Sequence, residues 1–188
     1  MKLVVLSGST IGSKTRTAMN QVMKTIEEDN PEAEATLIDL ADYDLVFSDG
    51  RDYREYKGDT QYVAETIMAA DALIVGTPIF QASIPGALKN VFDLLPQDGL
   101  RDKVASILVT AGSTRHYLIA ETQLKPVLAY MKAQLVQSFT FLDERDFFRK
   151  EIVNEDALFR IERLVEDTLV LTQTYKEIRE AKEAEYDF

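Results

Sequence analysis

The residues of this sequence best suited to bind a ligand lie in one short segment near the N-terminus. An apolar, β-branched run ends at Gly8, and helix-forming residues begin at Ala18. A strand, a polar turn and a helix together gather backbone N–H groups at the positive end of a helix dipole. We therefore predict a phosphate site in this turn; a helix merely capped by one Ser or Thr is the alternative. The turn contributes hydroxyls and cations on Ser9, Ser13, Thr15 and Thr17 and on Lys14 and Arg16.

This turn differs from two common phosphate loops. Residues 8–15 come within one residue of the pattern G-x-x-x-x-G-K-[ST], but Ser13 stands where the second Gly belongs. A nucleotide triphosphatase also needs a carboxylate at a strand end to hold Mg²⁺, and neither Ala72–Val75 nor Ser106–Val109 is followed by Asp. The dinucleotide pattern G-x-G-x-x-G fails at Thr10. The turn suits a single phosphate monoester, as in flavin mononucleotide (FMN).

The composition is that of an ordinary globular chain and argues against several kinds of chemistry. With 188 residues, 46% apolar and 28% charged, we expect one domain over residues 1–188. The net charge of −11 argues against a nucleic-acid partner. Cysteine is absent, which excludes thiol nucleophiles and disulfides, and His116 is the single histidine. No apolar run has membrane length and no signal-peptide pattern is found, so we expect a cytoplasmic protein with no membrane partner.

Hydrophobic periodicity predicts strands that alternate with helices. We predict an α/β fold with a doubly wound, five-stranded parallel sheet in the order 2-1-3-4-5 and helices on both faces. The expected strands are the run before Gly8, then Glu34–Leu40, Ala72–Val75, Val104–Val109 and Gln134–Phe141. The expected helices are Thr15–Glu28, Gln61–Ala70, Pro85–Leu95, Tyr117–Lys132 and a long helix from Asn154. Ser83 is expected to cap the third helix, and the fourth is expected either to kink at Pro126 or to begin near Leu124. The charged end of the last helix, Lys176–Phe188, is expected to fray.

In a doubly wound sheet, ligands bind at the carboxyl ends of the central strands. Three polar loops fall at those ends, and we expect them to form one site. They are Ser9–Thr17, Thr77–Ser83 and Thr110–His116. The polar loop Asp42–Tyr56 is long for a connector, and long loops are often functional.

With these residues in view, the chain resembles the NAD(P)H-dependent FMN reductase family, which has the flavodoxin-like fold. It is most similar to the flavin reductases of two-component alkanesulfonate monooxygenase systems. The resemblance runs from the N-terminus to about Phe141 and is carried by three segments. They are GSTIGSKTRT (8–17), GTPIFQASIPGALKNVFDLLP (76–96) and TAGSTRHYLIAETQLKPVLAYMKAQ (110–134).

The resemblance implies an oxidoreductase with FMN and NADPH (or NADH) as cofactors. Hydride would pass directly between the two cofactors, so that neither a catalytic side chain nor a metal is implied. It also implies a set of cofactor-binding residues in each of the three loops. Ser9, Ser13, Lys14, Thr15 and Thr17 would bind the phosphate; Thr77, Pro78, Ile79 and Phe80 would lie against one edge and face of the isoalloxazine ring; Ala111, Gly112 and Ser113 would meet its pyrimidine end through backbone groups.

The sequence leaves several functional alternatives open. The reduced flavin is supplied to an acceptor or monooxygenase, or FMN stays bound in a quinone or azo-dye reductase, or the protein is a flavodoxin-like electron carrier. The choice between NADPH and NADH is also open. We expect a homodimer or homotetramer, because the helix Pro85–Leu95 carries more apolar residues than one face needs. Burial of that helix within its own domain is the alternative.

Overall fold

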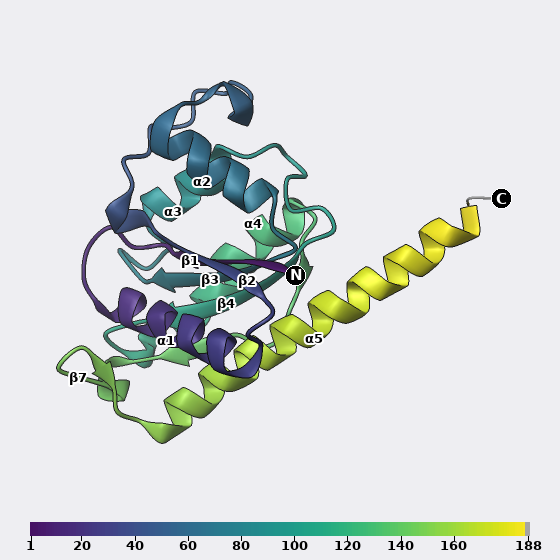
Figure 1. Cartoon of the computed structure of the whole chain (residues 1–188). Helices are drawn as coiled ribbons and strands as arrows, with labels where there is room; N and C mark the ends of the chain where they lie inside the picture. Colours follow the sequence, from purple (N-terminus) through teal and green to yellow (C-terminus); the bar gives the residue numbers. More distant parts are fainter. Residues whose placement is uncertain (187–188) are drawn as a thin grey trace.

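The computed structural model describes residues 1–186. Its centre is a parallel sheet with helices packed on both faces, which gives three layers (Figure 1). The short apolar runs of the sequence form this sheet, because strands covered on both faces need apolar residues at nearly every position. The strands are β1 (Lys2–Ser7), β2 (Glu34–Asp39), β3 (Ala72–Pro78), β4 (Val104–Thr110), β5 (Gln134–Leu135) and β6 (Thr140–Leu142).

The strand order is β2-β1-β3-β4-β5, and all of these pairings are parallel. The predicted doubly wound fold is thereby confirmed. The predicted fifth strand, Gln134–Phe141, is wrong in its extent, because it is divided into β5 and β6, which pair with the two ends of β4. Between them the Gln137 carbonyl accepts a hydrogen bond from the Lys125 ammonium at 2.6 Å. A side chain thus takes up a carbonyl of the segment between β5 and β6.

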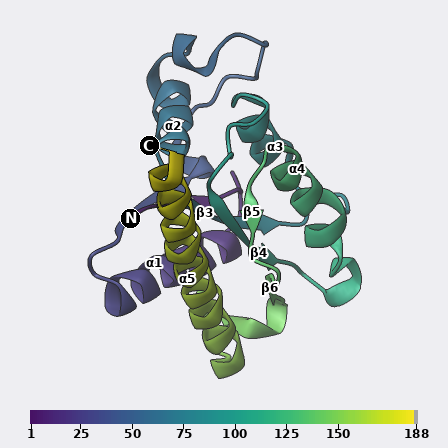
Figure 2. The same ribbon diagram turned by 90° about the vertical axis from the view of Figure 1, so that its right-hand side faces the viewer.

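The helices cover both faces of the sheet, so each face has its own core. Because successive side chains of a strand point to opposite faces, the residues of β1 alternate between these two cores. Val4 and Leu6 face the core covered by α2, α3 and α4, whereas Leu3 and Val5 face the core covered by α1 and α5. Figure 2 shows α5 crossing its face of the sheet beside α1. The helices are α1 (Lys14–Asp29), α2 (Gly58–Met68), α3 (Gly86–Asp93), α4 (Lys125–Tyr130) and α5 (Glu155–Tyr186).

The predicted helix Tyr117–Lys132 is interrupted, as its internal proline requires. Ala120–Leu124 forms a π-helical turn, and α4 then begins at Lys125 with Pro126 in its first turn. Proline is tolerated there because the first N–H groups of a helix have no intrahelical acceptor. Of the two predicted alternatives, the one in which the helix begins near Leu124 is confirmed.

The beginning of α3 differs from the prediction. Its N-cap is Pro85, so the predicted Ser83 cap is wrong. Ser83 instead pairs with Phe80 through two backbone hydrogen bonds, of 2.9 and 3.0 Å. These bonds close a tight turn ahead of the helix, and this turn fixes the position of Ser83.

The long helix α5 continues to Tyr186, through most of the segment that was expected to fray. Side chains four residues apart, such as Arg179 and Glu183 at 3.2 Å, support its last turns. Residues 187–188, which end the predicted tail, lie outside the described part of the chain. Neither α5 nor any other helix within residues 1–186 is long and apolar enough to cross a membrane.

A small antiparallel hairpin between β6 and α5 was not predicted. Its strands are β7 (Phe147–Phe148) and β8 (Glu151–Ile152), joined by Arg149 and Lys150; we call it the β7–β8 hairpin. Both turn residues have positive φ, 48° and 66°. Such turns favour Asn-Gly, so the sequence lacks the usual hairpin signature.

The apolar residues of α3 and the turn after it are covered within the domain. Those predicted to need a second subunit are at most 8% exposed, apart from the half-buried Ile84. Burial in the core of a single chain accounts for them, so the predicted physical reason for a dimer is lost. The residues buried in this way are Leu88, Val91, Phe92, Leu94 and Leu95.

Candidate functional site

The three polar loops meet at the carboxyl edge of the sheet, where the loop from β1 to α1 is visible in Figure 1. Because β1, β3 and β4 are neighbours, Ser7 lies beside Gly76, and Pro78 lies beside Thr110. The N–H group of Gly8 donates to the carbonyl of Gly76 at 2.7 Å, which joins the first loop to the end of β3. The predicted juxtaposition of the three loops is thus present in the fold.

The first loop presents backbone donors that the protein does not use. None of the N–H groups of residues 9–16 donates to an acceptor within the described chain, and Ser13, the N-cap of α1, makes no side-chain cap. The loop passes close to its neighbours at Gly8, where a Cβ would lie 2.9 Å from the carbonyl oxygen of Gly76. Free N–H groups at the positive end of α1 are suited to bind an anion.

Three hydroxyls of the first loop differ in how free they are. The Ser9 hydroxyl donates to the Ile11 carbonyl at 2.5 Å, and the Thr17 hydroxyl donates to the Lys150 carbonyl at 3.3 Å. The Ser13 hydroxyl has no hydrogen-bond partner within residues 1–186. Of the predicted phosphate ligands in this loop, Ser13 is therefore the one whose hydroxyl is free in the folded chain.

Two further hydroxyls are buried, one on Thr15 within the first loop and one on Ser7 just before it. Thr15 shares a 2.7 Å hydrogen bond with Thr110, which ties the first turn of α1 to the end of β4. Ser7, the last residue of β1, is fully buried, and its hydroxyl has no partner within the described chain. An unsatisfied buried hydroxyl is costly, so its position directly before the free N–H groups fits a site completed by a bound anion. Ser7 was missed from sequence, although a polar residue that ends an apolar strand marks it.

The two cations of the first loop are already paired with carboxylates. Arg16 contacts Asp39 at 2.5 Å and Asp42 at 2.7 Å. Both hydrogen bonds raise the pKa of Arg16, and the bond to Asp39 has the larger effect. Lys14 lies 3.3 Å from Glu144, a residue far away in sequence. Two cations therefore face three carboxylates, and the loop has little net positive charge of its own.

The second loop exposes two of the four residues predicted to contact a flavin ring. Thr77 and Pro78 are buried at the end of β3, and the Thr77 hydroxyl donates to the Pro78 carbonyl at 2.9 Å. Ile79 is half-buried, and Phe80 is 36% exposed beside the tight turn that it forms with Ser83. An aromatic ligand at this edge can reach the side chains of Ile79 and Phe80.

The third loop offers the backbone of two residues. Ala111 is 7% exposed, and its N–H group donates to the Leu142 carbonyl at 2.9 Å, so this donor is used within the protein. Gly112 and Ser113 are exposed. A Cβ on Gly112 would meet no atom within 4 Å, so the backbone there is accessible to a ligand.

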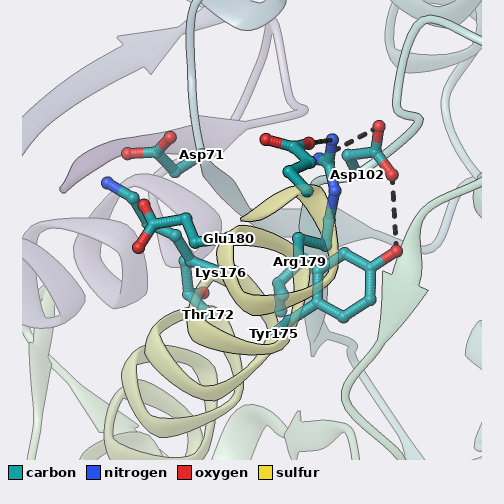
Figure 3. A pocket seen from close by; sticks show the side chains of 9 residues that line it. Asp71, Asp102, Thr172, Tyr175, Lys176, Arg179 and Glu180 are labelled. Carbon is teal, nitrogen blue, oxygen red and sulfur yellow. Dashed lines mark hydrogen bonds and ion pairs between the residues drawn. The ribbon is translucent and has the colours of Figure 1, made fainter. Parts of the chain in front are cut away.

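A separate hollow of about 220 Å³ lies at the opposite, amino edge of the sheet, against α5 (Figure 3). Asp102 there contacts Arg179 at 3.0 Å and Tyr175 at 3.4 Å, and Arg179 also contacts Glu183. Because these groups satisfy one another, they hold α5 against the sheet, and the candidate site remains the carboxyl edge. No group of three or more His, Cys, Asp or Glu residues within 1–186 is placed to hold a metal.

The fold is that of a flavodoxin-like α/β protein, with three polar loops and unused backbone donors at the carboxyl edge of its sheet. Residues 1–147 match the family described as NADPH-dependent FMN reductase. The chain belongs to this family, which confirms the resemblance seen in the sequence. It is therefore an oxidoreductase with FMN and NAD(P)H as its cofactors.

Individual relatives agree with this assignment. An NAD(P)H-dependent FAD/FMN reductase of Geobacillus thermodenitrificans is 39% identical over 87% of this chain and 89% of its own. The NADH-dependent FMN reductase SfnF of Pseudomonas fluorescens is 29% identical over 93% and 94%. Among solved structures, the apo form of the NADH:FMN oxidoreductase EMOB has a TM-score of 0.75 and 28% identity, over 90% of this chain and 89% of its own.

Proposed function

We propose that this protein reduces FMN with NAD(P)H by direct hydride transfer to flavin N5 and supplies the reduced flavin to an acceptor or monooxygenase. The observation that carries the proposal is the set of free N–H groups in residues 9–16, beside two loops with accessible aromatic and backbone groups. This arrangement matches the two ends of a flavin mononucleotide, a phosphate and a flat ring. The names of the relatives, which are FMN or FAD/FMN reductases, support the same substrate class.

The flavin, when bound, supplies the hydride-accepting ring, and the protein supplies binding and orientation. The N–H groups of the first loop and the hydroxyls of Ser9, Ser13, Thr15 and Thr17, with Lys14, are the proposed phosphate ligands. Ile79 and Phe80, next to Thr77 and Pro78, are proposed to lie against the ring, and Ala111, Gly112 and Ser113 to border its pyrimidine end. Holding two rings in reactive contact accelerates transfer through orientation alone, so no side chain acts as an acid, base or nucleophile.

The test is a turnover assay with NADPH and with NADH against FMN, FAD and riboflavin. We expect consumption of one or both nucleotides with FMN and weaker binding of riboflavin, which lacks the phosphate. An electron carrier would consume no nucleotide in this assay. A quinone or azo-dye reductase with tightly bound FMN would give a yellow protein peak on gel filtration in dilute buffer, whereas a reductase that releases its flavin gives a colourless one. Equal affinity for riboflavin and FMN would remove the phosphate site from the proposal.

The single histidine provides a second test of the hydride mechanism. His116 is exposed in the third loop. If hydride passes directly between the rings, His116→Asn should change turnover by less than about tenfold, roughly 1.4 kcal/mol of barrier. A His116→Asn variant that binds FMN normally but turns over hundreds of times more slowly would mean that His116 transfers a proton.

Assembly and cellular context also belong to the proposal. We propose a homodimer or homotetramer in the cytoplasm, with a monooxygenase as a further partner. The exposed Tyr130 and half-buried Val127 of α4 lie along a groove of about 510 Å³ between α3 and α4, which offers a contact surface although the apolar residues of α3 are covered within the domain. Sedimentation at micromolar concentration decides between a monomer and an oligomer.

A further inference from the structure

The β7–β8 hairpin, whose turn consists of Arg149 and Lys150, contacts the first loop through its backbone. The carbonyl of Lys150 accepts a 3.3 Å hydrogen bond from the hydroxyl of Thr17, in the first turn of α1. Thr17 is about 6 Å along the helix axis from Ser13, at the end of α1 where the free N–H groups lie. Phe147 and Ile152 pack against the core beneath α1, which fixes the hairpin in this place. Figure 1 shows β7 near the beginning of α1.

The two residues of the hairpin turn have no carboxylate partner. Arg149 and Lys150 are exposed, and neither forms an ion pair within residues 1–186. The guanidinium of Arg149 lies over the ring of Phe148, 5.2 Å from its centroid. Glu151, the carboxylate next in the chain, pairs with neither cation. By contrast, the two cations of the first loop are paired with carboxylates.

The backbone conformation of the turn makes Arg and Lys unexpected at these two positions. Both residues adopt positive φ, 48° for Arg149 and 66° for Lys150. Asn and Gly fit this two-residue turn with less strain, because a longer side chain disfavours the left-handed region. Local folding therefore does not explain two cations at these positions. Strained residues of this kind often serve a function that requires their side chains.

A phosphate group at the first loop would be stabilised by positive charge, and the loop's own cations are already paired with carboxylates. Such a group carries close to two negative charges at neutral pH, whereas Lys14 and Arg16 face three carboxylates and the whole chain carries a net charge of −11. We propose that Arg149 and Lys150 supply the positive charge that holds the flavin phosphate at the first loop. This inference rests on the proposed function, since it takes FMN as the ligand.

The test replaces the turn by the sequence that its backbone prefers, in the variant R149N/K150G. Dissociation constants for FMN, FAD and riboflavin are measured at low and high salt, together with the melting temperature of the ligand-free protein. We expect weaker FMN binding by about tenfold at low salt, a difference that shrinks at high salt because salt screens exposed charges. Riboflavin affinity should not change. The ligand-free protein should be at least as stable as the wild type.

The matched control removes two cations elsewhere, in the variant K132G/K182Q. Lys132 is exposed and also has positive φ, 74°, but it lies next to β5 at the amino edge, and Lys182 lies near the end of α5. This control has the same net charge as R149N/K150G and should keep FMN affinity within about twofold of the wild type, because exposed charges farther away than a Debye length are screened. An equal loss in both variants would mean that only net charge matters and would overturn the inference.

Three other outcomes also decide the matter. Unchanged FMN affinity in R149N/K150G, with a folded protein, overturns the inference. An equal loss of riboflavin affinity would show that the hairpin acts on the shape of the site and not on the phosphate, which overturns the inference. A loss of FAD affinity without a loss of FMN affinity would assign the cations to the second phosphate of FAD, which also overturns it. The proposed function fails separately, when wild-type protein does not prefer FMN to riboflavin or consumes no NAD(P)H with FMN.

Discussion

The two edges of the central sheet both carry clusters of polar groups, but these groups are satisfied in different ways. At the amino edge, Asp102, Tyr175 and Arg179 contact one another, and the ammonium of Lys103 donates to the carbonyls of Met68 and Ala70 at 2.7 and 2.6 Å. Burial lowers the pKa of Lys103. At the carboxyl edge, the N–H groups of residues 9–16 have no acceptor within the described chain.

This difference separates the proposed phosphate site from a structural cluster. The amino edge has charged side chains around a defined hollow, and Arg179 and Lys103 there both have acceptors in the protein. The carboxyl edge has backbone donors with no acceptor in the described chain, and the buried Ser7 hydroxyl beside them also has no partner there. Unused donors, because they are costly to bury or to leave unpaired, are the better sign of a binding site.

The largest expected effect comes from disturbing the backbone of the carboxyl edge in Gly8→Ala. The new Cβ would lie 2.8 Å from the Leu88 side chain and 2.9 Å from the Gly76 carbonyl oxygen, so the loop must move. We expect the free energy of unfolding to fall by roughly 1–3 kcal/mol. FMN affinity should fall by more than about 100-fold, because several donors to a charged group move together. Gly86→Ala, at a position with no atom within 4 Å, is the control and should bind FMN normally.

A smaller effect is expected when one free donor is removed in Ser13→Ala. Its hydroxyl makes no bond in the folded chain, so the stability of the ligand-free protein should stay within about 0.5 kcal/mol. FMN should bind at least about tenfold more weakly, because a hydrogen bond to a charged group contributes about 1.5–3 kcal/mol. The control is Thr66→Ala, which removes a hydroxyl that donates to the Tyr62 carbonyl at 2.6 Å within α2. Loss of stability without loss of FMN affinity in Ser13→Ala would contradict the assignment.

Freeing a cation from its ion pair at the carboxyl edge should raise FMN affinity, whereas the two changes above lower it. Glu144→Gln removes the carboxylate that lies 3.3 Å from Lys14, and both side chains are substantially exposed. We expect FMN to bind a few-fold more tightly, with no change for riboflavin, because an exposed ion pair contributes about 0–1 kcal/mol. Titration of both ligands by flavin fluorescence measures this. Unchanged or weaker FMN binding would show that Lys14 does not act on the phosphate.

The smallest change in FMN affinity is expected from a substitution at the amino edge. Arg179→Ala removes contacts with Asp102 and Glu183 from partly exposed side chains. Stability should fall by no more than about 1 kcal/mol, and FMN affinity and turnover should stay within about twofold of the wild type, since the site lies at the other edge of the sheet. A large loss of FMN binding in a folded Arg179→Ala variant would end the distinction between the two edges.

Much of the fold and the location of the site could be predicted from local sequence. Buried parallel strands such as β3 (Ala72–Pro78) consist of short apolar runs, and the polar residues that follow them must lie at one edge of the sheet. The split of the fifth strand and the cap of α3 at Pro85 were mispredicted, because they depend on contacts such as that of Lys125 with Gln137. The β7–β8 hairpin was missed because its turn, Arg149–Lys150, lacks Asn and Gly.

By itself, the sequence determined the order of strands and helices, the three loops at the carboxyl edge and the hydroxyl-rich turn, because propensity, periodicity and glycine placement act over a few neighbouring residues. Only the tertiary structure decided which of these groups are free. It paired Lys14 with Glu144 and Arg16 with Asp39, and it left the hydroxyl of Ser13 unbonded. The physical reason is that a hydrogen bond or an ion pair depends on distances of a few ångströms between residues far apart in the chain, and these distances exist only after the sheet and helices have packed.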